Sequence, residues 1–340
     1  MLGLGGIAEE HLLKLRRIEA VEVVGVCDLS ETLVAAVCER FGVGPGFTDH
    51  RRMLAESAPD AVHVLTPPRT HRDLTLAALA AGAHVLVEKP AAPTFREYAE
   101  MRDAARDQGL LLIENYNYRF MPVVTRVLDM LAAGTLGRVL NVDVTMGIPL
   151  AGGAYADPDV PRFGHDLPGG ALHNFVSHPA SLVVAFVGPH ERVRVARRTL
   201  ISGFPGPDEL RALITTGDGA SAVLTVTGSA KRFGIGLCLQ ADGGTVEADL
   251  IEGRLHVDTG GSPLARITGG LRRGAGQLSA SAGVVSRTLT SRHDYYEGIG
   301  HLLTAFYDAV RHGSAPPIPV AEMDATNLLV ETLLDPENDR

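Results

Sequence analysis

The sequence predicts an α/β protein of two domains, with a parallel sheet in the first and an open, largely antiparallel sheet in the second. The first 120 residues alternate short apolar runs with helical patterns, as parallel sheets do when helices connect successive strands. From residue 121 onward, most apolar runs follow one another with only turn residues between them. A length of 340 residues suffices for about two domains. We therefore expect domains at 1–120 and 121–340.

The composition is that of a folded, acidic protein. Apolar residues make up 45% and charged residues 21%, and the net charge is −9. Surfaces that bind nucleic acid or an anionic membrane need clustered Lys and Arg, so neither partner is expected. Three cysteines without metal-ligand spacing fit a reducing cytoplasm and predict no metal site. The sequence contains no signal-peptide pattern, and we expect no membrane-spanning segment.

The chain begins with a glycine-rich turn. Gly3, Gly5 and Ala8 have the spacing G-x-G-x-x-A, which brings backbone close to a pyrophosphate and lets the next helix pack tightly. A strand at 21–28 then ends in Asp28, where a carboxylate binds the ribose of NAD and repels the 2′-phosphate of NADP. The alternative for Asp28 is a cap of the following helix. The residues expected to contact a dinucleotide here are Gly3, Gly5, Gly6, Ile7, Ala8 and Asp28.

A dinucleotide-binding fold needs a strand before its glycine turn, but only Met1 and Leu2 precede Gly3. Without that strand, backbone groups of the sheet would be unpaired. We therefore expect the natural chain to carry several more apolar residues upstream.

The rest of the first domain continues the alternation. Helices are expected at 9–17, 31–41, 51–57, 71–82 and 94–108, and strands at 47–48, 61–66, 85–90 and 110–115. Such spacing predicts right-handed crossovers and a parallel sheet covered on both faces.

The stretch VLVEKP places Glu88 and Lys89 at the carboxyl end of a buried strand, with Pro90 ending that strand. Ligands of open α/β sheets bind at this edge, so we expect cofactor and substrate to meet beside Lys89. The alternative is a charged pair that only solvates the strand end. Thr66, Pro67 and His71 follow the preceding strand, and His71 is either beside the cofactor or an exposed first-turn residue. The cofactor contacts expected at these strand ends are Thr66, Pro67, His71, Glu88, Lys89 and Asn115.

The second half has a different pattern. A helix at 122–133, a strand at 139–146, a loop at 147–168 and a helix near 171–187 are expected first. Apolar runs then follow at 192–199, 210–215, 221–227, 235–240, 244–250 and 254–259, with turn residues between them. Residues 261–290 are either a loop or a short helix, and helices at 295–311 and 321–334 close the chain.

In this order, the chain resembles the Gfo/Idh/MocA oxidoreductases. The matching segments are GLGGIAEEHL, the strand ending in Asp28, TPPRTH, EKP at 88–90, ENYNYRFMP from Glu114, LGRVLNVDV at 136–144, GGALHNFVSH at 169–178 and the closing helix before PPIPV. The resemblance implies a Rossmann domain, then an α/β domain whose open sheet serves in catalysis and forms a homo-oligomer. It also implies oxidation or reduction of a sugar, cyclitol or related alcohol with NAD, or alternatively NADP.

The resemblance places the proton-transferring group in GGALHNFVSH. The family has an Asp four residues before its His, whereas this chain has Asn174 before His178. A spacing of four puts both side chains on one helix face, where a neutral His178 can take the hydroxyl proton as hydride leaves. Lys89 can stabilise charge on the same oxygen. The alternative for His178 is a buried core histidine, and Asn174 cannot stabilise an imidazolium as a carboxylate does.

Other groups near the domain junction are further candidates. Tyr116 and Tyr118 are alternative proton donors or packing residues, and Arg119 either binds a substrate carboxylate or pairs with an acid. The expected substrate contacts are Lys89, Tyr118, Arg119, Asn174 and His178. Two other functions remain open, an NAD-dependent glycosidase and a non-catalytic NAD-binding sensor.

Overall fold

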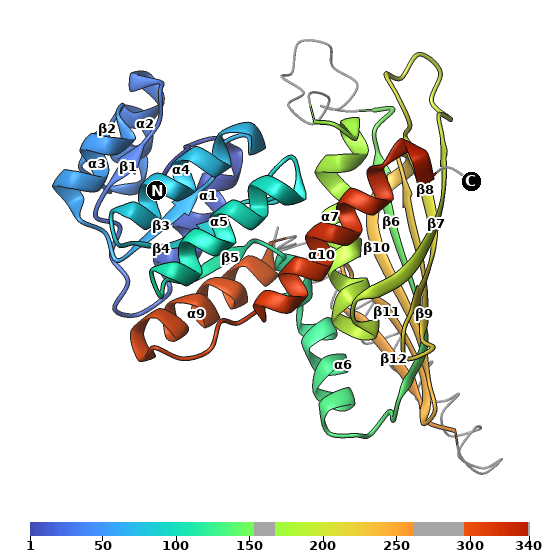
Figure 1. Cartoon of the computed structure of the whole chain (residues 1–340). Helices are drawn as coiled ribbons and strands as arrows, with labels where there is room; N and C mark the ends of the chain where they lie inside the picture. The colour runs from blue at the N-terminus through green and yellow to red at the C-terminus, as the bar shows by residue number, and fades with distance from the viewer. Residues whose placement is uncertain (153–166, 261–295, 339–340) are drawn as a thin grey trace. The chain divides into compact units, whose positions relative to one another are not determined.

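The computed structural model describes residues 1–152, 167–260 and 296–338 (Figure 1). These residues form two compact units, Met1–Asn117 with Ile299–Glu331, and Tyr118–Gly298 with Thr332–Arg340. The first unit thus ends close to the expected boundary at residue 120. It also includes most of two helices from the far end of the chain, which sequence order alone assigned to the second domain.

The first unit contains a parallel sheet. Its strands are β1 (Val26–Cys27), β2 (Gly46–Phe47), β3 (Ala61–Val64), β4 (His84–Val87) and β5 (Leu112–Glu114). β1 pairs with β2, and β3, β4 and β5 pair in that order, all in parallel. Leu2 bridges both groups through parallel contacts with Cys27 and Val64. The expected Rossmann-type parallel sheet is therefore confirmed.

Strand β1 is shorter than the strand predicted at 21–28, because only Val26–Cys27 is paired. The N–H of Cys27 donates to the carbonyl of Met1, and the amino group of Met1 donates to the carbonyl of Gly25. Within the described residues, 21–24 pair with no strand. Their alternating apolar pattern therefore does not produce a strand by itself.

Helices surround this sheet, and three of them begin at residues whose side chains cap them. They are α1 (Gly6–Leu15), α2 (Glu31–Phe41), α3 (His50–Ser57), α4 (His71–Ala80) and α5 (Phe95–Asp107). The side chains of Ser30, Asp49 and Thr94 accept backbone N–H groups at the starts of α2, α3 and α5. Short 3-10 turns, η1 (Pro68–Thr70) and η2 (Asn117–Phe120), follow β3 and β5.

Most of α9 (Glu297–His312) and α10 (Val320–Leu334) completes the first unit (Figure 1). Phe306 of α9 is fully buried, and Tyr98 of α5 donates a 2.9 Å hydrogen bond to Asp324 of α10. Apolar burial and side-chain hydrogen bonds thus attach residues more than 200 positions apart in the sequence.

The second unit contains a mixed, mostly antiparallel sheet in the order β12-β11-β10-β6-β9-β8-β7. β6 and β9 pair in parallel, and the other neighbours are antiparallel, which confirms the predicted open sheet. The strands are β6 (Val139–Pro149), β7 (His190–Arg198), β8 (Glu209–Thr216), β9 (Ser221–Thr227), β10 (Ser229–Ala241), β11 (Gly244–Asp249) and β12 (Arg254–Asp258).

One face of this sheet is covered by α7 (Gly170–Val187), which packs against β6 and β9 (Figure 1). Val142, Val144 and Met146 alternate along β6 as buried residues. By length and hydropathy, α7 qualifies as a candidate membrane span, but 83% of it is buried inside the protein, as in a core helix. α6 (Pro122–Ala132) and η5 (Pro336–Asn338) complete the unit.

Two expectations lie outside the described residues in whole or in part. The stretch 261–290 is outside them entirely. The predicted loop at 147–168 begins later than expected, because β6 continues to Pro149, and residues 153–166 are not described.

Candidate functional site

The glycine turn is shaped by close backbone packing. Gly3 has a φ of +89°, and a Cβ there would lie 2.8 Å from the backbone of Leu65. At Gly5 and Gly6 a Cβ would meet nothing within 4 Å, and both residues are exposed where α1 begins. Ala8 is 1% exposed, as a small residue under a tightly packed helix should be. The first N–H groups of α1 are therefore accessible to an anionic ligand.

Asp28 joins the end of β1 to this turn. Its Oδ2 accepts the N–H of Leu4 at 2.9 Å, and its Oδ1 accepts the N–H of Ser30 at 3.0 Å. The cap of α2 is Ser30, whose Oγ accepts the N–H of Leu33, so the alternative of Asp28 as that cap is wrong. The contact of Asp28 with a ribose stays a prediction.

His71 connects the loops that follow β3 and β4. Its side chain is fully buried, so the alternative of an exposed first-turn residue is wrong. Nε2 lies 2.6 Å from the carbonyl of Thr66, and Nδ1 lies 3.1 Å from that of Pro90. Burial lowers the pKa of His71, although these carbonyls and nearby Glu88 oppose that effect. The ring thus contacts the two loops that carry Thr66, Pro67 and Lys89, and its contact with a cofactor stays a prediction.

Glu88 and Lys89 lie directly after β4. Glu88 is 8% exposed, unlike a residue that only solvates a strand end. Its carboxylate accepts hydrogen bonds from Asn115 Nδ2 and from the backbone N–H of Lys89, and lies 3.3 Å from His11 Nε2. Burial lowers the pKa of Lys89, whereas the charges of Glu88 and Glu114 act to raise it. A lysine whose charge is this sensitive to its neighbours is typical of a functional site.

Glu114 is a buried acid that the sequence analysis did not single out. It lies at the end of β5 and accepts the N–H of Ala91 at 3.0 Å, Tyr116 Oη at 2.6 Å and Asn327 Nδ2 at 2.8 Å. Burial raises its pKa to about 7. The sequence signal was an acid closing an apolar strand, as Glu88 does at β4. The hydroxyl of Tyr116 is committed to Glu114, which favours the packing interpretation of this tyrosine.

The second unit contains the other predicted catalytic residues. His178 and Asn174 are four residues apart in α7, and His178 is 7% exposed. The ring of Tyr118 packs edge-on against that of His178, with ring centroids 4.6 Å apart. The ring centroids of Tyr118 and Phe233 are 6.3 Å apart. Burial lowers the pKa of neighbouring His173 to about 4. Tyr118 is therefore brought together with His178, whereas the convergence of His178 with Lys89 of the first unit stays a prediction.

The architecture of the first unit defines the class of this protein. A parallel sheet whose glycine turn opens a helix, with a carboxylate bound back to that turn, is that of a dinucleotide-binding protein. The chain belongs to the Gfo/Idh/MocA family. Residues 1–116 match the family model described as an oxidoreductase family with an NAD-binding Rossmann fold, and residues 124–247 match its GFO/IDH/MocA C-terminal domain.

Curated relatives include several sugar oxidoreductases. The chain is 30% identical over 193 residues to D-xylose 1-dehydrogenase (NADP(+)) 2 of Haloferax volcanii, covering 57% of this chain and 58% of that protein. It is 34% identical over 140 residues to D-glucoside 3-dehydrogenase of Escherichia coli, covering 41% and 40%. The chain spans about half the length of the curated relatives that it matches.

Solved structures have the same fold over nearly the whole chain. Levoglucosan dehydrogenase in complex with NADH superposes with a TM-score of 0.78 and 20% identity, covering 99% of this chain and 95% of that one. The WlbA dehydrogenase of Bordetella pertussis, in complex with NADH and UDP-GlcNAcA, gives a TM-score of 0.76 and 22% identity, covering 98% and 92%. At these identities the likeness supports the fold.

Proposed function

We propose that this protein is an NAD(P)-dependent oxidoreductase that transfers hydride between nicotinamide and a CH–OH carbon of a sugar or a related polyol. The first unit would bind the dinucleotide, and the second would bind the substrate. The observation that carries the proposal is Lys89, held after β4 beside buried Glu88, in a unit that matches an NAD-binding oxidoreductase model. Relatives named as sugar dehydrogenases support the substrate class.

The chemistry assigned to this chain's own residues is proton transfer and charge stabilisation. NAD, when bound, supplies or accepts the hydride. His178 takes the hydroxyl proton during oxidation and returns it during reduction. Lys89 stabilises negative charge on the same oxygen. Tyr118 contacts His178 edge-on and so restricts its ring, and Arg119 is the proposed contact for an acidic or hydroxyl group of the substrate.

A substrate screen tests the proposal. The protein is incubated with NAD or NADP and a panel of aldoses, anhydrosugars, glycosides and cyclitols, and reduced nicotinamide is followed at its absorbance maximum. Turnover of at least one sugar or cyclitol is expected. Release of free sugar from a glycoside without net NADH would instead favour the glycosidase. Binding of NAD without turnover of any compound would favour the sensor, which the neutral Asn174 also fits.

Cofactor preference depends on Asp28. We expect wild-type protein to bind NAD more tightly than NADP, because the carboxylate repels a 2′-phosphate. Asp28→Ser should weaken NAD binding and relieve the exclusion of NADP. Titration of both cofactors into both proteins, followed by isothermal titration calorimetry, measures this. Glu31→Gln, an exposed acid in the first turn of α2, is a matched control. Equal affinity of the wild type for both cofactors would contradict the prediction.

Asn174 is expected to limit the basicity of His178. Asn174→Asp restores the family's charge four residues away on the same helix face, and a carboxylate stabilises an imidazolium. The pH at which turnover in the oxidative direction reaches half its maximum should then rise. The pH–rate profiles of both proteins are compared, with Asn141→Asp on β6 as the control. An unchanged profile would show that residue 174 does not act on His178.

We further propose a cytoplasmic homo-oligomer formed through the open sheet. Leu140, Leu213 and Val223 are large apolar residues exposed on the second unit's strands. Light scattering after size-exclusion chromatography should give a mass above 36.0 kDa, and the double substitution Leu213→Glu with Val223→Glu should lower it.

A further inference from the structure

Helix α1 carries a buried histidine that has no role in the proposed mechanism. The side chain of His11 is fully buried, and its two ring nitrogens face different partners. Nε2 lies 3.3 Å from Oε1 of Glu88, and Nδ1 lies 2.9 Å from Nδ1 of His63. The remaining nitrogen of His63 lies 2.9 Å from the hydroxyl of Tyr307. Side chains from α1, β3, the end of β4 and α9 therefore form one hydrogen-bonded chain, all within the first unit.

The carboxylate end of this hydrogen-bonded chain fixes the direction of its first hydrogen bond. An ionised Glu88 only accepts, so Nε2 of His11 donates to it. Nδ1 of His63 is the partner of His11 Nδ1, and Nε2 of His63 is the partner of the Tyr307 hydroxyl. Every ring nitrogen of the two histidines thus has a partner. Burial, together with His11, keeps the pKa of His63 well below its usual range, which agrees with a neutral ring.

Tyr307 is a poor source of a proton for Glu88. Moving each proton one link toward the carboxylate would leave Tyr307 as a phenolate. Burial raises the pKa of Tyr307, so a phenolate there is strongly disfavoured. Burial also acts to raise the pKa of Glu88, but hydrogen bonds from His11 and Asn115 and the charge of Lys89 lower it overall. The hydrogen bond from His11 thus stabilises Glu88 as a carboxylate.

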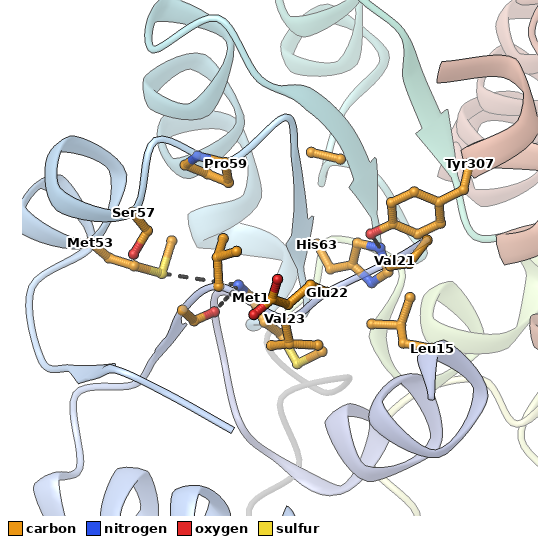
Figure 2. Close-up of a pocket in the computed structure, with 13 residues that line it drawn as sticks. Met1, Leu15, Val21, Glu22, Val23, Met53, Ser57, Pro59, His63 and Tyr307 are labelled. Carbon is orange, nitrogen blue, oxygen red and sulfur yellow. Dashed lines mark hydrogen bonds between the residues drawn. The ribbon is translucent and has the colours of Figure 1, made fainter. Parts of the chain in front are cut away.

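Figure 2 shows the outer end of this hydrogen-bonded chain, where His63 and Tyr307 point toward each other at the wall of a pocket. The amino group of Met1 lies in the same pocket, and burial lowers its pKa to about 5. At neutral pH it therefore adds little charge beside His63. The other titratable groups facing the chain are Glu22 on the pocket wall and Lys89, His71 and Glu114 around Glu88.

We propose that His11 is a positioning residue for Lys89: it fixes the ionised carboxylate of Glu88, which accepts the backbone N–H of Lys89 at 3.2 Å and supports the charge of its side chain. The inference rests on the proposed function, in which Lys89 acts on the reacting oxygen. It also assigns a second task to α1, since the helix that opens at the glycine turn would support the catalytic lysine that follows β4.

The test measures the charge of Lys89 without any substrate. The chain has only three lysines, Lys14, Lys89 and Lys231, so competitive acetylation followed by mass spectrometry can report each one's reactivity against pH. Exposed Lys231 is the internal reference. Compared with wild type, His11→Leu should shift the labelling midpoint of Lys89 to lower pH, because a buried Glu88 without its donor keeps a proton to higher pH and then gives Lys89 no counter-charge. His11→Gln should stay close to wild type, since its amide can donate to Glu88 and accept from His63.

Two further variants keep the test decisive. His63→Phe retains ring packing against Phe306 but removes the hydrogen-bond partner of His11 Nδ1, so a smaller shift in the same direction is expected. Glu88→Gln removes the carboxylate charge itself, so it should shift the midpoint of Lys89 at least as far as His11→Leu does. His11→Leu combined with Glu88→Gln should shift it little further than Glu88→Gln alone. An unchanged Lys89 midpoint in folded His11→Leu, or in His63→Phe if the former does not fold, would overturn the proposal.

Activity then separates this inference from the proposed function. With a substrate in hand, His11→Leu should lower kcat about tenfold with little change in NAD affinity, and His11→Gln should restore most of it. If the labelling shifts occur but no sugar is turned over by any variant, including wild type, the proposed function fails while the positioning role stands.

Discussion

Replacing Lys89 with alanine is expected to lower turnover by about 100-fold or more while NAD affinity changes little. A preorganised charge that acts on a developing oxyanion stabilises the transition state more than the bound ground state, and losing one such donor typically costs about 100- to 1000-fold. His178→Ala should lower turnover by a similar factor, about 100-fold or more, because proton transfer loses its acceptor. Turnover and NAD affinity of both variants, measured with the substrate found in the screen, test this.

Matched controls are available in both units. Lys231 and His301 are exposed, and replacing either with alanine should leave turnover near the wild-type rate. The double variant Lys89→Ala with His178→Ala should lose less than the product of the single losses if both groups act on one oxygen. Turnover near wild type in both single variants would remove this mechanism, and Tyr118, packed against His178, would become the leading proton donor.

Glu114→Gln is expected to change how stability depends on pH. Folding raises the pKa of this carboxyl from 4.5 to about 7, mainly through burial, so the folded protein binds its proton more tightly than the unfolded chain does. The favourable contribution is fully present below about pH 4.5 and is lost as the pH rises through about 7. A shift of this size corresponds to about 3 kcal/mol of the free energy of unfolding.

Glutamine reproduces the protonated form at every pH. The variant should therefore be about as stable as wild type near pH 5 and more stable than wild type at pH 8, by up to about 3 kcal/mol. Urea unfolding at both pH values measures the difference. Glu39→Gln, an exposed acid on α2, is the control and should change neither value. A Glu114→Gln variant with the same pH dependence as wild type would show that this carboxyl does not titrate in that range.

The fold class could be predicted because it follows from local pattern. Apolar runs separated by helical spacing require crossovers and hence a parallel sheet, and the short turns between most runs from β7 to β12 favour hairpins. The glycine turn was readable because Gly3 needs a positive φ beside Leu65, which few other residues tolerate. Lys89 was readable because Pro90 ends its strand. These features depend on residues close together in the sequence.

Local pattern alone did not settle the extent of one strand or the burial of one histidine, for a physical reason. The run at 21–28 has a strand's alternation, but strand pairing needs a neighbour, and only Val26–Cys27 has one. An exposed His71 was one of two alternatives because the sequence does not show that the loop at Pro90 covers it.

The sequence by itself determined the class of fold, the glycine turn, the acid at Asp28 and the lysine after β4. Only the tertiary structure decided which distant groups control those residues. Asn327 reaches Glu114 from 213 positions away, and Tyr307 reaches His63 from 244. The physical reason is that the protonation state of a buried group depends on the hydrogen-bond donors packed around it. Those donors come from whichever helices cover the sheet rather than from neighbours in the sequence.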